Sequence, residues 1–114
     1  MTNLEINVAI SESCGWYKDR NWDINHLWSH PDVLGSAKED ELPDCANDLC
    51  EIHKAVKTLS QEHYDGFDGF TANLARVTHG DTAPIDGWKF RPMQEATSRQ
   101  RSEAFLRAIG KWKE

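Results

Sequence analysis

The chain has 114 residues and carries 19 acidic and 13 basic side chains, which gives a formal net charge of −6. Its length suits a single domain with one hydrophobic core, over residues 1–114, and its acidic balance argues against direct binding to nucleic-acid backbones, because that binding depends on Lys and Arg. No apolar run is long enough to span a membrane and no signal-peptide pattern opens the chain, so we expect a cytoplasmic protein.

A first helix is predicted over residues 3–14. Thr2 and Glu5 stand in capping-box positions, where each side chain can bind the backbone amide of the other residue. Apolar residues follow at helical spacing. Gly15 then supplies the left-handed residue that commonly ends a helix.

The segment from residue 16 to residue 43 is predicted to be mostly irregular. It contains three tryptophans, with polar residues between them. A strand over residues 16–22 and a short helix over residues 23–30 remain open. Pro31 would end such a helix, because a proline disfavours helical backbone at the residue before it, here His30.

The central element is predicted to be a helix over residues 44–63, which keeps one helical register from end to end. Asp44 is its expected N-cap, and acidic residues near its start suit the positive end of the helix dipole. Its apolar stripe consists of Cys45, Leu49, Ile52, Val56 and Leu59.

Two further helices are predicted. One covers residues 67–79 and forms an antiparallel pair with the central helix, although its apolar residues partly alternate and a strand stays open there. Residues 81–96 contain the Pro and Gly signals of a loop. The last helix covers residues 98–110, with Thr97 as its cap and Gly110 as its stop.

The fold class that follows is mainly α: a four-helix single domain with long irregular loops and a few short strands. The alternative is α+β, with helices against a small antiparallel sheet. The predicted core residues are Ile6, Ile10, Leu49, Ile52, Val56, Leu74, Phe105 and Ile109.

Three blocks of the sequence resemble small phage and prophage proteins of uncharacterised function, related to the phage ABA-sandwich group. The blocks are Ile6-Asn7 with Ala9-Ile10 and Cys14-Gly15-Trp16, then Pro43 to Leu49 with His53 to Val56, then Ala96-Thr97 with Gln100-Arg101 and Glu103 to Arg107. Cys45 stands where an aromatic residue is expected. The resemblance implies a fold and a phage setting, hence an infected or lysogenic bacterial host, and it carries over no catalytic residue.

Asp23, His26 and His30 are the best metal candidates, because their spacings of three and four would place them on one side of a helix. His53 or Cys50 would complete a set of four ligands. Pro31 disturbs that helix, however, and no strong zinc spacing is present. We therefore predict neither a metal site nor a cofactor.

Cys50 and His53 lie one turn apart on the central helix, where a thiol and an imidazole could touch. A catalytic pair needs more, and the sequence supplies no oxyanion hole, nucleophile elbow, P-loop or dinucleotide fingerprint. The prediction is that the protein is not an enzyme. The odd number of cysteines, Cys14, Cys45 and Cys50, indicates reduced and mostly buried thiols.

The densest acidic stretch is the predicted partner-binding site. Residues 32–68 hold ten acidic and three basic residues, whereas residues 87–114 hold three acidic and seven basic residues. An acidic face can occupy a groove built for nucleic acid, because its carboxylates take the place of phosphates. Ordinary helix capping is the structural alternative. The proposed contacts are Glu39, Asp40, Glu41, Asp44, Asp48 and Glu51.

With the phage setting, this face favours a non-enzymatic phage-encoded binding protein. It would be a counter-defence inhibitor of the anti-CRISPR kind, and its partner would be a host or defence protein with a basic surface. Two alternatives remain. Arg99, Arg101 and Arg107 could bind a phosphate group near the helix start at Thr97, as a sponge for a signalling nucleotide would, or could simply pair with the acidic helix. A structural or assembly accessory is the other alternative, and a homodimer stays open.

Overall fold

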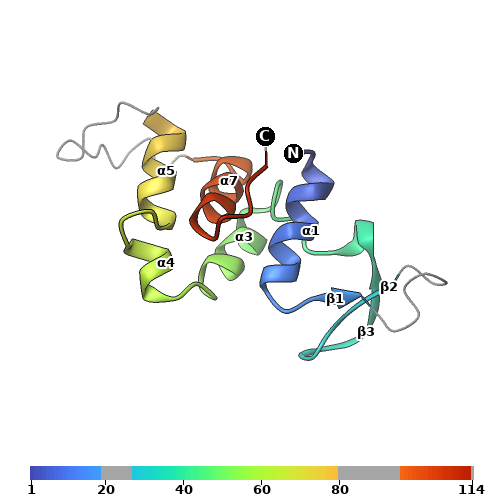
Figure 1. Cartoon of the computed structure of the whole chain (residues 1–114). Coiled ribbons are helices and arrows are strands. Elements are labelled where there is room, and N and C mark those ends of the chain that lie inside the picture. Colours follow the sequence, from blue (N-terminus) through green and yellow to red (C-terminus); the bar gives the residue numbers. More distant parts are fainter. Residues whose placement is uncertain (19–26, 80–95, 114) are drawn as a thin grey trace.

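The structure, a computed structural model, describes residues 1–18, 27–79 and 96–113. Within these ranges helices predominate, and a small three-stranded antiparallel sheet lies at one end (Figure 1), so the prediction of a mainly helical chain with short strands is confirmed. In chain order the elements are α1 (Asn3–Ser13), β1 (Tyr17–Lys18), β2 (Leu27–His30), β3 (Val33–Lys38), the 3-10 helix η1 (Glu39–Glu41), α3 (Leu49–Val56), α4 (Gln61–Asp65), α5 (Phe70–His79) and α7 (Ser98–Ala108).

The two outer helices begin where predicted and end slightly earlier, α1 at Ser13 and α7 at Ala108. Thr2 Oγ1 accepts from the Glu5 amide at 3.1 Å, and the Thr2 amide donates to the Glu5 carboxylate at 3.0 Å. The same reciprocal pair joins Thr97 and Gln100 at the start of α7. Gly15 and Gly110 follow the two helices with φ of +106° and +75°, the left-handed backbone that favours glycine.

The sheet has the order β1-β2-β3, with Tyr17 opposite Ser29 and His30 opposite Val33. The short helix considered for residues 23–30 is therefore wrong over residues 27–30, which form a strand. Extended backbone at His30 agrees with the steric demand of the proline that follows it. The strand considered for residues 16–22 is present at Tyr17–Lys18.

The single helix predicted over residues 44–63 is wrong, because two shorter helices, α3 and α4, take its place. Asp48, not Asp44, is the N-cap of α3, and its Oδ1 accepts from the Cys50 amide at 2.8 Å. Ser60 caps α4 by accepting from the His63 amide. A side chain that binds local backbone in this way competes with helix continuation, so the chain breaks between the end of α3 and the Ser60 cap.

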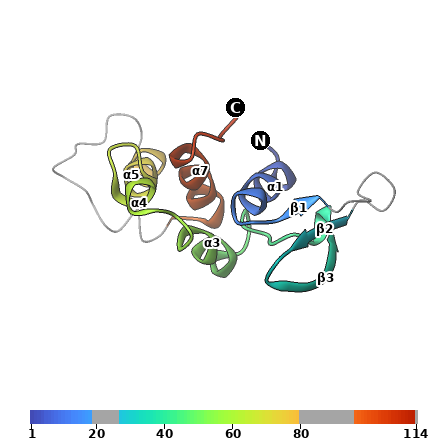
Figure 2. The same ribbon diagram turned by 60° about the horizontal axis from the view of Figure 1, so that its bottom comes forward.

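The third predicted helix begins later than expected, at Phe70. Asn73 fixes this start by donating to the carbonyl oxygens of Asp68 and Gly69, each at 2.8 Å. The preceding Phe67 is 89% exposed and outside the helix. α5 packs mainly on α7 and also on α4, rather than as an antiparallel partner of α3. Figure 2 shows α7 between α5 and α1, with α3 beside it.

One buried cluster joins α1, α3, α5 and α7. The predicted core residues Ile6, Ile10, Ile52, Leu74 and Phe105 are all buried, and Val56 and Ile109 pack against the same cluster while partly exposed. Leu49 is the exception, with 47% of its surface exposed. It is the first residue of α3, directly after the cap. The buried residues of this helix, Ile52 and Ala55, come later along it.

The segment before α3 runs through the interior between α1 and α7. Cys45 and Ala46 are buried there. The Asn7 side chain donates to the Asp44 carboxylate and accepts from the Ala46 amide, both at 2.9 Å. From α7, the Ser102 hydroxyl donates to the carbonyl oxygen of Cys45 at 2.8 Å. These bonds hold residues 44–46 against α1 and α7, and they thereby set the positions of the acidic residues on either side of this segment.

Candidate functional site

The six acidic residues predicted to bind a partner fall into two groups. Glu39, Asp40 and Glu41 form η1, which contacts α1 and the end of β3. The other three lie before α3 or in its first turn, and each has a described bond: Asp44 with Asn7 and Asn47, Asp48 with the Cys50 amide, and Glu51 with Lys54 at 3.2 Å. Capping and local pairing therefore account for this second group.

Within η1 the three carboxylates differ. Glu41 accepts from the Lys38 amide at 3.0 Å and so serves the turn itself. Among the residues that the structure describes, the carboxylates of Glu39 and Asp40 make no hydrogen bond or ion pair. Their negative charges are thus available to a partner.

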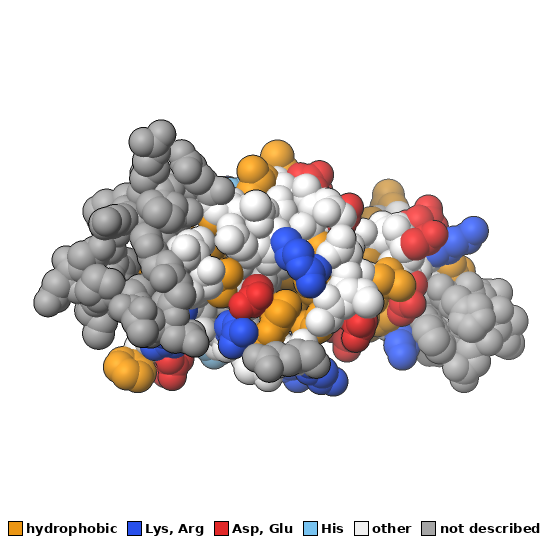
Figure 3. All heavy atoms as spheres, turned by 90° about the horizontal axis from the view of Figure 1, so that it is seen from above, with side chains coloured by type: hydrophobic (Ala, Val, Ile, Leu, Met, Phe, Trp, Pro, Cys, Tyr) orange, Lys and Arg blue, Asp and Glu red, His pale blue; other side chains and the backbone are white. Residues whose placement is uncertain are grey.

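Glu39 also lines a groove of about 610 Å³ between α1 and the C-terminal tail. The floor is apolar, with Leu4, Val8 and Ala9 from the outer face of α1. The charged lining residues are Glu5, Glu12, Glu39, Lys111 and Lys113. Figure 3 views the molecule from the side on which both termini lie, and its acidic side chains are most frequent over the half that holds α1 and the sheet.

Sequence reasoning missed Glu5 and Glu12 as members of this surface. Their separation of seven residues puts them on one face of α1, and this spacing was the available signal. Their association with Glu39 depends on the packing of η1 against α1, which no local pattern reveals. The structure therefore joins two acidic sets that lie far apart in the sequence.

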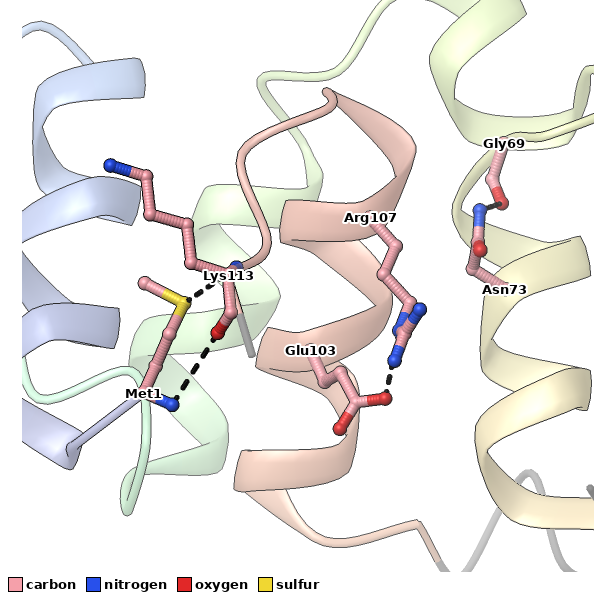
Figure 4. Close-up of polar contacts among 6 residues, drawn as sticks. All are labelled: Met1, Gly69, Asn73, Glu103, Arg107 and Lys113. Atoms are coloured by element: carbon pink, nitrogen blue, oxygen red, sulfur yellow. Dashed lines mark hydrogen bonds and ion pairs between the residues drawn. The ribbon is translucent and has the colours of Figure 1, made fainter.

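The groove is acidic along α1 and basic at its terminal end. The pKa of Glu5 is held below its usual value, first by the hydrogen bond from the Thr2 amide and then by that from the Thr2 hydroxyl, with smaller contributions from the N-terminal ammonium and Lys113. Figure 4 shows that Met1 binds the C-terminal tail at Lys113. The Met1 ammonium donates to the Lys113 carbonyl oxygen at 3.4 Å, and the Met1 sulfur accepts from the Lys113 amide at 3.3 Å.

The arginines of the alternative phosphate site make contacts in three different places. Arg99 donates to the Asn3 side chain and to the Met1 carbonyl oxygen. Arg101 donates to the Ala96 carbonyl oxygen at 3.1 Å. Arg107 binds Glu103 of its own helix at 2.8 Å, as Figure 4 shows, and its guanidinium lies 5.6 Å from the Trp112 ring centre. These described contacts do not gather the three side chains around one pocket.

The metal candidates are only partly described, since Asp23 and His26 lie outside the described residues. His30 lies on β2, where its Nε2 is 2.9 Å from the Cys14 carbonyl oxygen and its Nδ1 accepts from the Asp32 amide at 3.0 Å. Both ring nitrogens are thus occupied by backbone groups. No cluster of three or more metal-binding side chains occurs in the part of the chain that the structure describes.

The cysteines have three different environments. Cys45 is buried, and burial raises its pKa to about 12. Cys14 is half-buried, and burial also raises its pKa, against a smaller effect of its hydrogen bond with Thr58. Cys50 is exposed, so the prediction of mostly buried thiols is wrong for it. No described hydrogen bond joins Cys50 to His53.

Comparisons with family models, curated proteins and solved structures found no match to this chain. In the described segments, no helix has the length and apolar character needed to cross a membrane.

Proposed function

We propose that this chain is a non-enzymatic, phage-encoded binding protein that inhibits a host or defence protein by covering its basic, nucleic-acid-binding surface, as an anti-CRISPR protein would. The observation that supports this most is the position of Glu39 and Asp40. Their carboxylates have no described partner, and Glu39 stands with Glu5 and Glu12 around one groove. The phage setting is supported by the sequence blocks that resemble phage and prophage proteins.

The groove has the properties that such an interface needs. Its carboxylates would face Lys and Arg side chains of the partner, which speeds association and makes it sensitive to salt. Its apolar floor would supply contact area at the centre of the interface. Leu4, for example, is 45% exposed on this floor. Lys111 and Lys113 would orient the partner, because they repel basic groups at one end of the groove.

The nucleotide-sponge alternative has no comparable support, because Arg99, Arg101 and Arg107 make their described contacts in different places. An assembly accessory is the outcome that remains if no regulatory partner exists.

Two matched variants test the proposal. The first carries Glu39→Lys and Asp40→Lys, which leaves the capping residues intact. The control carries Glu62→Lys and Asp65→Lys on α4, at the other end of the molecule, and has the same net charge (Figure 1). Wild-type and control proteins, immobilised and exposed to nuclease-treated host lysate, should retain a nucleic-acid-binding protein at low salt. The first variant should lose it.

Retention of the same protein by both variants, or retention that does not weaken in high salt, would contradict the proposal. A thermal-shift screen with cyclic and linear nucleotides tests the sponge alternative in parallel, because a ligand at about 100 times its Kd adds about 2.7 kcal/mol to the free energy of unfolding.

A further inference from the structure

A second hollow, of about 270 Å³, lies between the end of α1, the β2–β3 hairpin and α3. Figure 2 shows these three parts next to one another. Its walls are mostly apolar and include Ile10, Trp16 and Ala55. It shares no lining residue with the acidic groove. The hollow is therefore a separate site from the acidic groove.

Ser11, in the last turn of α1, is one of the residues that line this hollow, and its hydroxyl is unpaired within the described segments. The residue is 2% exposed, and its Oγ makes no hydrogen bond with any residue that the structure describes. Buried hydroxyls nearly always have a partner, because an unpaired one costs free energy. A polar atom of a ligand at the inner end of the hollow would supply that partner.

The other polar groups of the wall already have partners. The Thr58 hydroxyl donates to the Ala55 carbonyl oxygen at 2.6 Å, and it also lies 3.8 Å from the Cys14 sulfur. The His30 ring is bound at both nitrogens. Lys54 is 71% exposed in its side chain and pairs with Glu51 at the mouth. Among the described lining residues, Ser11 is thus the one whose buried polar group still needs a hydrogen-bond partner.

The dimensions and the walls define the kind of ligand. Pockets for drug-sized ligands measure about 300–1,000 Å³, and an apolar cavity of about 150 Å³ is enough for benzene, so this hollow has room for one aromatic ring with its substituents. The thiols of Cys14 and Cys45 keep their protons because burial raises the pKa of each, which leaves the inner wall uncharged. Trp16, whose ring centre lies 5.3 Å from that of His30, adds an aromatic surface.

We infer that this hollow binds a small neutral aromatic molecule whose single hydroxyl or carbonyl group forms a hydrogen bond with Ser11. The ring lies against the apolar wall, and the polar group reaches the end of α1. A charged aromatic molecule is disfavoured, because the two charged residues of the lining, Glu51 and Lys54, already pair with each other.

Phenol and toluene are the two probes that test this inference, since they share a ring and differ in the hydroxyl. Titration followed by amide NMR should give saturable shifts that centre on the residues around the hollow. In Ser11→Ala, the ratio of the phenol Kd to the toluene Kd should rise about 3- to 10-fold, as expected for one neutral hydrogen bond. In the matched control Thr58→Val, that ratio should stay unchanged, because the Thr58 hydroxyl already has a partner.

The unliganded variants give a second readout. Ser11→Ala should keep or raise the melting temperature, because it removes an unpaired buried hydroxyl and adds a better helix former. A marked fall would show that the hydroxyl is already paired in the free protein, which would overturn the inference. It is also overturned if neither probe gives saturable shifts at the hollow, or if Ser11→Ala leaves the Kd ratio unchanged.

Discussion

His30 joins the sheet to the end of α1 through a hydrogen bond from its Nε2 to the carbonyl oxygen of Cys14, at 2.9 Å. Its Nδ1 accepts from the Asp32 amide at 3.0 Å, which leaves Nε2 as the nitrogen that carries the ring proton. Gly15 permits this approach, because a Cβ at that position would lie 3.0 Å from Nε2. One side chain therefore holds both the hairpin turn and the helix end.

Replacing His30 by alanine should lower the free energy of unfolding by about 1–3 kcal/mol, because the variant loses hydrogen bonds to two backbone groups. Chemical denaturation at neutral pH measures this. His53→Ala is the matched control, since His53 is exposed on α3 and its loss should cost less than about 0.5 kcal/mol. Equal stability of the two variants would show that His30 does not link the sheet to α1.

Because both ring nitrogens of His30 are hydrogen-bonded to backbone groups, they are not available to bind a metal ion. We predict that purified protein contains less than about a tenth of an equivalent of zinc and that a chelator leaves its melting temperature unchanged. Elemental analysis and a thermal scan measure both quantities. Stoichiometric zinc that disappears in His30→Ala would instead establish a metal site at this position.

Two positions on α3 separate core from surface. Ile52 is fully buried, so Ile52→Ala should cost about 2–5 kcal/mol in unfolding free energy. Leu49 is 47% exposed on the same helix, and Leu49→Ala should cost less than about 1 kcal/mol. Denaturant unfolding of the pair measures the difference. Similar losses in both variants would mean that Leu49 belongs to the core after all.

The raised pKa of Cys45 leads us to predict that the protein loses stability at high pH. Burial raises its pKa from an ordinary value of 9.0 to about 12, so between these values the unfolded chain has lost the thiol proton and the folded chain keeps it. The stability contributed by the protonated thiol is therefore present below pH 9.0 and is lost as the pH rises toward 12.

Cys45→Ala isolates this effect, because all other groups titrate equally in both proteins. The stability advantage of the wild type over the variant should shrink between about pH 8 and about pH 10.5, as the linkage requires. Urea unfolding at the two pH values measures it. A constant advantage would mean that the thiol is as accessible in the folded protein as in the unfolded chain.

The features that sequence analysis predicted correctly are those set by chemistry over three or four residues. The caps at Thr2 and Thr97 and the stops at Gly15 and Gly110 need only neighbouring side chains and backbone. The later start of α3 and its break from α4 were missed although their signals, the caps Asp48 and Ser60, are in the sequence. The apolar stripe hides the break, because its last residues, Val56 and Leu59, both pack against the core although Leu59 lies beyond the end of α3.

The candidate site was only partly predictable. The run from Glu39 to Glu41 is visible as an acidic sequence, but its position beside Glu5 and Glu12 depends on how η1 packs on α1. Strand β3 was equally hidden, since most of its residues are exposed and show no apolar alternation. Ser11 gives no sequence signal, because only the packing around α1 leaves its hydroxyl unpaired.

The central claim is that the acidic groove occupies the nucleic-acid-binding surface of its partner. The most direct test is the Kd between this protein and the purified partner retained from lysate, measured by calorimetry at rising concentrations of the partner's own nucleic acid. We predict that the apparent Kd increases in proportion to the nucleic acid, and that Glu39→Lys with Asp40→Lys weakens binding while Glu62→Lys with Asp65→Lys does not. An apparent Kd that stays constant at saturating nucleic acid would contradict the account.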